Sequence, residues 1–360
     1  MTRKDAELRR AGQATRPEET FAQSGREELS KRAEAFLDWR DAVLTNEDIE
    51  AIHKMRVASR RLRATMDAYK PACRTKYFKQ VYRTVKKAAY LLGAARDTDV
   101  MVQHVEGLMK IAPGEEQVGM RWFVEQLTSY RAACQHAIEG FLVSLDETAF
   151  QETVTSCLPK AVSKDKAKAK PGLNIHAPTG YGARSIARVK LEELYRWRDA
   201  VDRPYAVREL HQLRIAAKRF RYTLEIFEPF LPEGCTSVVK ELEQVQEELG
   251  QLHDSDVMIA LLRLCLGNLE YPLASQIIAV EEAPRAKPRP FVPTALVLSL
   301  LNPKRAPTAE QRYGLEQLVR QQQYQREEGF STFHQHWSHL QERDIRLNLL
   351  ALLEEELTVR

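Results

Sequence analysis

The stretch HKMRVASRRLR, which runs from His53 to Arg63, decides how the rest of this sequence is interpreted. At about 100° per residue, four cationic side chains fall within roughly 80° of a helix surface: His53, Arg56, Arg60 and Arg63. No Asp or Glu occurs between His53 and Met66. A helix face that is merely solvated usually interleaves both signs of charge, so this pattern predicts a helix that presents a basic stripe to an anion.

A second stretch, HQLRIAAKRFR from His211 to Arg221, repeats this pattern. Its cations have the same spacing, and no acid follows before Glu225; they are His211, Arg214, Lys218 and Arg221. Upstream, the pentapeptide WRDAV occurs at 39–43 and again at 197–201. Downstream, Leu-Gly leads to a DxDVM block at 97–101 and again at 254–258. Three matched blocks in one order predict an internal duplication.

These blocks resemble the CHAD family, the conserved histidine α-helical domain. The resemblance covers roughly residues 25–360 and rests on the histidine- and arginine-containing helix followed by Leu-Gly and Asp-x-Asp-Val in both halves. It implies an all-helical, two-lobed protein that binds inorganic polyphosphate. Many members of that family are found on polyphosphate granules, so granule-associated proteins are further candidate partners.

Composition is ordinary for a globular protein, but the charge is unevenly distributed. The 360 residues are 44% hydrophobic and carry a net charge of +4. Between His53 and Arg96, thirteen Lys and Arg stand against one acid, a net charge of +12, so the rest of the chain sums to −8. A basic segment in an otherwise acidic chain is typical of a polyanion site. The five scattered cysteines, the charged N-terminus and the lack of a long apolar run favour a cytoplasmic protein.

The sequence predicts an all-α fold, because no segment shows the alternation of a strand. We expect two four-helix bundles, related by a pseudo-two-fold axis around a central basic groove. The predicted divisions are a mobile arm at 1–24, a first lobe at 25–158, a basic linker at 159–182, and a second lobe at 183–360 with a proline-rich insertion at about 270–309. Helical spacing also predicts an apolar stripe that faces the core: Met55, Ala58, Leu62, Met66 and Tyr69.

The basic residues are the candidate site. Arginine suits phosphate because its planar fork donates two parallel hydrogen bonds and stays charged. A helix over about 76–92 adds a second stripe, whereas in the second half Thr236 and Glu243 replace two of its lysines, so the lobes are expected to contribute unequally. The predicted polyphosphate-binding residues are His53, Arg56, Arg60, Arg63, Lys79, Arg83, Lys86, His211, Arg214, Lys218, Arg221 and Lys240. Further candidates are Arg61, Arg219, Lys76, Arg96 and Tyr222, of which the first two lie off the stripe and are expected to bind acids of neighbouring helices.

Other clusters leave alternatives open. The pairs Asp97/Asp99 and Asp254/Asp256 could hold Mg²⁺, but their position after Leu-Gly favours capping of a new helix, with Gly93 ending the previous one. Three histidines near the C-terminus, His334, His336 and His339, are interpreted as a surface cluster. We expect no catalytic residue, metal or cofactor, because the phosphate-loop, zinc-protease and serine-hydrolase motifs are missing. A nucleic-acid-binding protein and a Mg²⁺-dependent phosphotransferase or phosphatase are the alternative functions.

Overall fold

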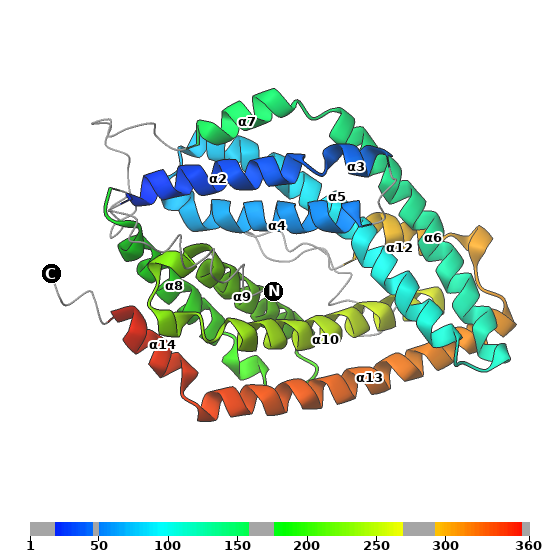
Figure 1. The fold of residues 1–360 in the computed structure, drawn as a ribbon. Helices are drawn as coiled ribbons and strands as arrows, with labels where there is room; N and C mark the ends of the chain where they lie inside the picture. Colours follow the sequence, from blue (N-terminus) through cyan, green and yellow to red (C-terminus); the bar gives the residue numbers. More distant parts are fainter. Residues whose placement is uncertain (1–18, 46–49, 158–175, 269–291, 355–360) are drawn as a thin grey trace.

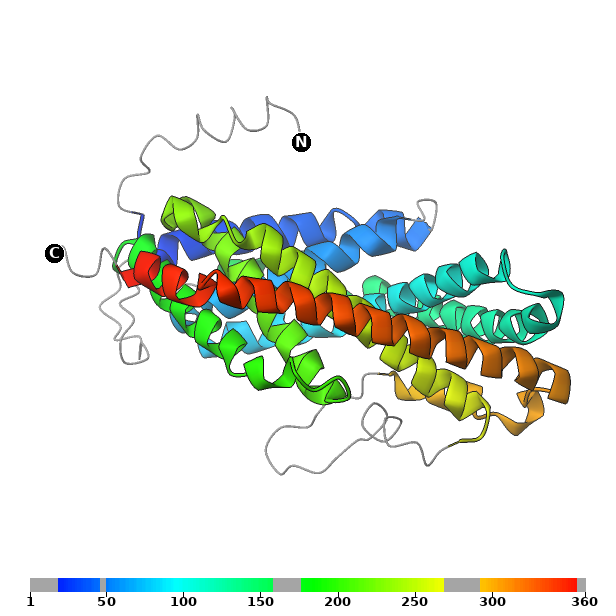
Figure 2. The same ribbon diagram turned by 90° about the horizontal axis from the view of Figure 1, so that it is seen from below.

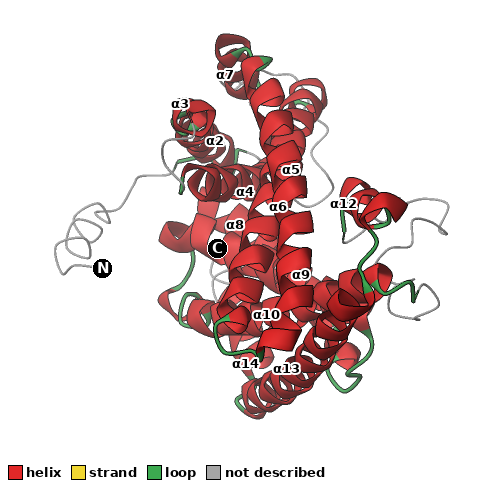
Figure 3. Cartoon of the chain, turned by 90° about the vertical axis from the view of Figure 1, so that its right-hand side faces the viewer, coloured by secondary structure: helices red, strands yellow, loops and turns green. Residues whose placement is uncertain are grey.

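The computed structural model describes residues 19–45, 50–157, 176–268 and 292–354, and these form helices joined by short turns. Within these ranges there is no strand, only an isolated bridge between Thr20 and Pro178 (Figure 3). The all-α prediction is confirmed. No helix in the same ranges is both long and apolar enough to cross a bilayer.

The helices of residues 179–354 follow the order of those in residues 21–155 (Figure 1). The first half contains α2 (Phe21–Leu37), α3 (Arg40–Thr45), α4 (Ala51–Tyr69), α5 (Thr75–Met109), α6 (Gly114–Val143) and α7 (Glu147–Thr155). The second half contains α8 (Thr179–Tyr195), α9 (Val207–Phe227), α10 (Val239–Cys265), α12 (Thr294–Leu300), α13 (Ala309–Glu342) and α14 (Ile345–Glu354). The succession of contacts α2–α4–α5–α6 is matched by α8–α9–α10–α13.

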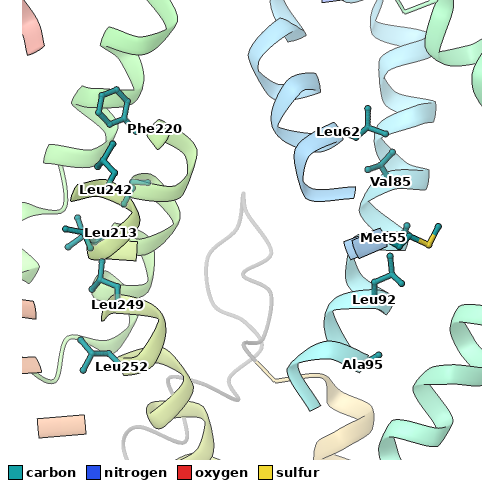
Figure 4. Packing of buried hydrophobic residues seen from close by; sticks show 14 of the residues in the cluster. Met55, Leu62, Val85, Leu92, Ala95, Leu213, Phe220, Leu242, Leu249 and Leu252 are labelled. Atoms are coloured by element: carbon teal, nitrogen blue, oxygen red, sulfur yellow. The ribbon is translucent and has the colours of Figure 1, made fainter. Parts of the chain in front are cut away.

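Each half has an apolar layer behind its basic helix, as the sequence predicts (Figure 4). On α4, Met55 and Leu62 are fully buried and face α5, where Val85 and Leu92 lie. On α9, Leu213 and Phe220 face the leucines of α10 in the same way. Burial of such side chains contributes roughly 1.5–3 kcal/mol each, so the apolar stripes fix which side of α4 and α9 is turned away from the core.

Three aromatic rings join the two halves. Phe21 of α2 lies 4.8 Å from Tyr69 of α4, measured between ring centroids, and Tyr69 lies 5.3 Å from Phe227 of α9. All three side chains are fully buried, and the Tyr69 hydroxyl is 2.8 Å from that of Ser24. Because Phe227 ends α9, this contact holds α4 and α9 together at one end of their crossing.

A close helix crossing joins the halves again at their longest helices. The end of α13 near Ala309 lies beside the hairpin of α5 and α6 in both Figure 1 and Figure 2. Gly119 of α6 faces Gly314 of α13, and a Cβ added at Gly119 would lie 2.7 Å from the backbone nitrogen of Leu315 and against the carbonyl oxygen of Gln311. The backbones of α6 and α13 therefore touch, so the two halves are packed closely at this end as well.

Two predicted helix boundaries are wrong. Helix α5 continues through Gly93 and Asp97, and α10 continues through Gly250 and Asp254, so these aspartates cap no helix. An arginine of the basic helix passes beside each glycine: a Cβ at Gly93 would meet Arg56 Nε at 4.0 Å, and one at Gly250 would meet Arg214 Nε at 3.7 Å, both ordinary contact distances. Glycine costs a helix about 1 kcal/mol relative to alanine, but neither glycine ends its helix here.

Three of the predicted segments contain parts of described helices. Helix α2 begins at Phe21, inside the predicted arm of 1–24, and α8 begins at Thr179, inside the predicted linker of 159–182. Helix α12 and a 3-10 turn at Pro303–Arg305 lie inside the predicted insertion of 270–309. The remainder of the arm, most of the linker and residues 269–291 lie outside the described residues.

We expect Gly119→Ala to lower the free energy of unfolding by about 1–3 kcal/mol, because the new methyl group would force α6 and α13 apart. Gly140→Ala, on an exposed part of the same helix with no atom within 4 Å of its added Cβ, is the matched control. It should raise stability by about 0.5–1 kcal/mol through helix propensity. Urea unfolding measures both; equal effects of the two substitutions would contradict the close crossing.

Candidate functional site

The two basic helices meet. Helices α4 and α9 lie on the sides of the two halves that face each other, and they pack together (Figures 1 and 3). Arg60 of α4 donates a hydrogen bond from Nη2 to the hydroxyl of Tyr222 on α9 at 2.6 Å. Lys218 lies within electrostatic reach of Arg56, Arg60 and Arg63 from the other half. We call Arg56, Arg60, Arg63, Arg214 and Lys218 the basic cluster.

Burial and like-charge repulsion both act on the basic cluster. Burial and the neighbouring guanidinium groups, Arg60 first among them, hold the pKa of Lys218 well below its usual value. Burial likewise lowers the pKa of Arg214, against the pull of Asp254. An ammonium group in such surroundings binds its proton weakly unless an anion approaches. The cluster therefore has the electrostatics of an anion-binding site.

Two carboxylates compensate part of this charge. Asp97 of α5 accepts a hydrogen bond from Arg56 Nη2 at 2.9 Å, and Asp254 of α10 acts on Arg214. Asp254 is exposed at one side, but the protein packed around its carboxylate removes part of its hydration and raises its pKa to about 6 against the pull of Arg214; the charge of Asp97 adds to this rise. Five cations thus face two carboxylates, one of which is a weakened acid.

The second aspartate of each motif has a different partner. Asp99 accepts a hydrogen bond from Arg131 Nε of α6 at 2.8 Å. Asp256 accepts one from Arg326 Nε of α13 at 2.7 Å, and both of these side chains are only 4% exposed. The aspartates therefore form ion pairs that tie α5 to α6 and α10 to α13, in place of the capping role that the sequence suggested.

The motif histidines sit at the edge of the cluster. His53 is half-buried, and its pKa is lowered by burial and by Arg96. His211 lies against His253, with ring centroids 4.5 Å apart and the two Nδ1 atoms at 3.3 Å. Burial lowers the pKa of His211 to about 4 and holds that of His253 well below its usual value, with Arg214 adding to both. Both imidazoles of this pair are therefore neutral near pH 7.

Sequence reasoning missed His253, although a signal for it was present. It directly precedes Asp254, just as Arg96 directly precedes Asp97. In both halves the residue before the Asp-x-Asp block lies near the motif histidine, as Arg96 does for His53. The repeat register therefore pointed to this position, but its chemistry differs between the halves.

Arg221 is placed differently from its counterpart Arg63. It is buried and pairs with Glu243 at 2.6 Å and with Glu225 at 3.5 Å, so its charge is already compensated. Arg63 lies over the ring of Tyr82, 6.0 Å from its centroid. The structure thus brings Arg63 to the open cluster and leaves Arg221 in an internal ion-pair network.

The second predicted stripe lies on the surface of α5. Lys79, Arg83 and Lys86 are exposed, and none of them forms an ion pair within the described part of the chain. Lys79 and Asp97 are 18 residues apart, which is five helical turns, so they share a face of α5. The stripe therefore continues along the helix from the Arg56–Asp97 pair.

The remaining candidates are scattered. Arg61 and Lys240 line a pocket beside the cluster, and Arg61 acts on Glu225, the kind of acid partner that was expected for it. Arg219 is exposed on α9, and Lys76 lies over the ring of Tyr77. Tyr222 is central, because Arg60, Lys218 and Arg221 all lie over its ring.

The C-terminal histidines do not converge. His334 approaches Asp202, His336 approaches Glu248, and His339 approaches Glu342 on its own helix. Among the described residues, no group of three or more His, Cys, Asp or Glu side chains is arranged to hold a metal ion.

Comparison with known proteins gives one family and one fold. No curated protein sequence matches this chain significantly. The crystal structure of the CHAD domain from the plant Ricinus communis is similar with a TM-score of 0.54 and 22% identity, over 83% of this chain and 92% of that one. PptA from Streptomyces chartreusis is similar with a TM-score of 0.58 and 15% identity, over 89% of this chain and 100% of that one. The CHAD domain family model matches residues 27–263, so this chain belongs to the CHAD domain family.

Proposed function

We propose that this protein binds inorganic polyphosphate on the basic cluster and the stripe of α5, without cleaving it. The observation that carries this proposal is the meeting of five cations from two halves with only two carboxylates between them. The CHAD family is linked in general to polyphosphate, which agrees with that charge pattern. Targeting to polyphosphate granules or scaffolding of them, in the cytoplasm, is the cellular role we propose for such binding.

The arrangement favours a linear ligand over a small one. A single phosphate would need only the cluster, but Lys79, Arg83 and Lys86 place further exposed cations on the same face of α5, the farthest roughly 27 Å from Asp97 at 1.5 Å per residue. Arginine and lysine repeated along that face match a chain of regularly spaced negative charges. The second half offers less, because Glu243 occupies the matching face of α10 and pairs with Arg221.

Nucleic acid fits this surface less well. Binding of single strands depends on aromatic rings whose faces are open to stack bases. Tyr222, the aromatic residue at the centre of the cluster, has the guanidinium carbons of Arg60 and Arg221 at 5.8 and 5.1 Å from its ring centroid and Lys218 Nζ at 6.0 Å. Its ring is therefore engaged by cations that a phosphate chain would also contact.

The aspartates support binding without chemistry. Asp97, Asp99 and Asp256 form ion pairs with arginines, and Asp254 faces Arg214. Each of these carboxylates thus has a structural role as the partner of an arginine. We therefore expect no hydrolysis or phosphoryl transfer: long-chain polyphosphate incubated with the protein and Mg²⁺ or Mn²⁺ should keep its length on a gel. If the polyphosphate becomes shorter in proportion to the protein concentration, and Asp254→Asn abolishes this shortening, then the protein is an enzyme.

Removal of two cluster cations should weaken polyphosphate binding by about 100-fold. The double variant Arg60→Gln/Lys218→Gln takes one charge from each half, and neither residue has a carboxylate hydrogen-bond partner among the described residues. The slope of log affinity against log salt should also become shallower, by about 0.7–0.9 for each lost contact. The control Arg188→Gln/Lys190→Gln removes the same charge from α8, where the residues pair with Glu354 and Glu193. Equal losses of affinity in both variants would show that binding depends only on the net charge of the protein and not on the basic cluster.

Binding should take up protons. A bound polyanion opposes the repulsion on Lys218 and raises its pKa toward the usual value. Affinity for polyphosphate should therefore fall as the pH rises above the pKa that Lys218 has in the ligand-free protein. Titration calorimetry in buffers of different ionisation enthalpy measures this uptake. Lys218→Arg, which stays charged throughout, should bind with smaller uptake. Unchanged uptake in that variant would show that Lys218 is not the group that titrates.

A further inference from the structure

A pocket of about 530 Å³ lies beside the basic cluster. Its walls come from α2, α4, α9 and the beginning of α10, so both halves contribute. Such a volume is typical of a site for a small molecule or for one end of a larger ligand. Its polar lining consists mainly of Arg32, Arg61, Tyr222, Glu225, Glu228 and Lys240.

Tyr222 connects this pocket with the basic cluster. Tyr222 lines the pocket, and its hydroxyl accepts the hydrogen bond from Arg60. The cations Lys218 and Arg221 lie over the same ring. A chain of phosphates bound to the cluster would therefore be separated from the pocket only by Tyr222.

The charges of the pocket suit one anionic group and discourage a longer run. Arg61 and Lys240 are exposed, and neither forms an ion pair within the described part of the chain. Arg32 is paired with Glu28 at 3.4 Å. Glu225, whose pKa burial raises, and Glu228 supply opposing negative charge. Three cations from three helices are thus bounded by two carboxylates.

One of the positions at which the two halves differ lies in the wall of this pocket. The register that matches Gly93 with Gly250 also matches Tyr82 with Val239. In the first half, Tyr82 stacks on Phe78 with centroids 5.2 Å apart and donates a hydrogen bond to Asp67. Val239 is much smaller and lines the pocket, so the space that a phenol ring would fill remains open.

From these features we propose that the pocket binds the terminal phosphate of a polyphosphate chain whose next phosphates lie on the basic cluster. This inference rests on the proposed function. A terminal phosphate has one more ionisable oxygen than an internal one, so it can accept hydrogen bonds from Arg61 and Lys240 together. It also has no continuation, so the carboxylates of Glu225 and Glu228 repel only a chain that would extend further. Free pyrophosphate offers the same chemistry and is therefore one arm of the test.

The test compares ligands with and without ends. Wild-type protein should bind a linear polyphosphate about tenfold more tightly than a cyclic polyphosphate of equal formal charge. Val239→Tyr, which places a ring in the pocket and changes no charge, should remove this preference and leave cyclic polyphosphate binding unchanged. Arg61→Gln/Lys240→Gln should also remove the preference, by removing the donors, while the two lost charges weaken the binding of linear and cyclic polyphosphate equally; it covers the case in which Val239→Tyr does not fold. Val189→Tyr, on the exposed face of α8, is the matched control and should keep the preference.

Three outcomes would overturn the assignment. Equal binding of linear and cyclic polyphosphate by the wild type would remove the end site but leave the proposed function intact. Pyrophosphate that binds as tightly as the linear chain would make the pocket a site for free phosphates. Failure of the wild type to bind either polymer would instead refute the proposed function itself.

Discussion

The structure depends on holding like charges together at the contact of α4 and α9. Arg56, Arg60 and Arg63 face Arg214 and Lys218 across that contact, and their repulsion opposes it. At an effective dielectric constant of about 20, two unit charges 4 Å apart interact by about 4 kcal/mol, which is comparable to the net stability of a domain. The contact must therefore be stabilised from elsewhere, and an anion on the cluster would stabilise it further.

That stabilisation comes from apolar and backbone contacts on either side of the cluster. At one end, Phe21, Tyr69 and Phe227 pack as a buried trio drawn from both halves. At the far end, Gly119 and Gly314 allow α6 and α13 to touch. Neither contact involves the basic residues. The cations are thus held in place by groups that can be kept unchanged while the charges are varied.

The two halves use one pattern for different purposes. In the first half, Arg63 lies over Tyr82 and the stripe of α5 is open to solvent. In the second half, Glu243 neutralises Arg221, and Val239 leaves a pocket where Tyr82 stands in the first. A few substitutions on two matched helices thus turn an extended basic surface into a bounded one. The two sides of the cluster therefore differ: one continues onto the exposed cations of α5, and the other meets the pocket with its two carboxylates.

The sequence by itself determined the helical class, the two basic stripes, the apolar stripe behind them and the unequal charge of the halves. These features depend on spacing over three to seven residues, which the periodicity of a helix fixes locally. The tertiary structure decided that α5 and α10 continue through Gly93 and Gly250, where each helix packs against a basic helix of its own half. It also decided that the stripes meet, that Arg326 and not a backbone amide is the partner of Asp256, and that His253 lies against His211. The Asp256–Arg326 and His211–His253 pairs join residues 70 and 42 positions apart, and no local pattern specifies such a contact.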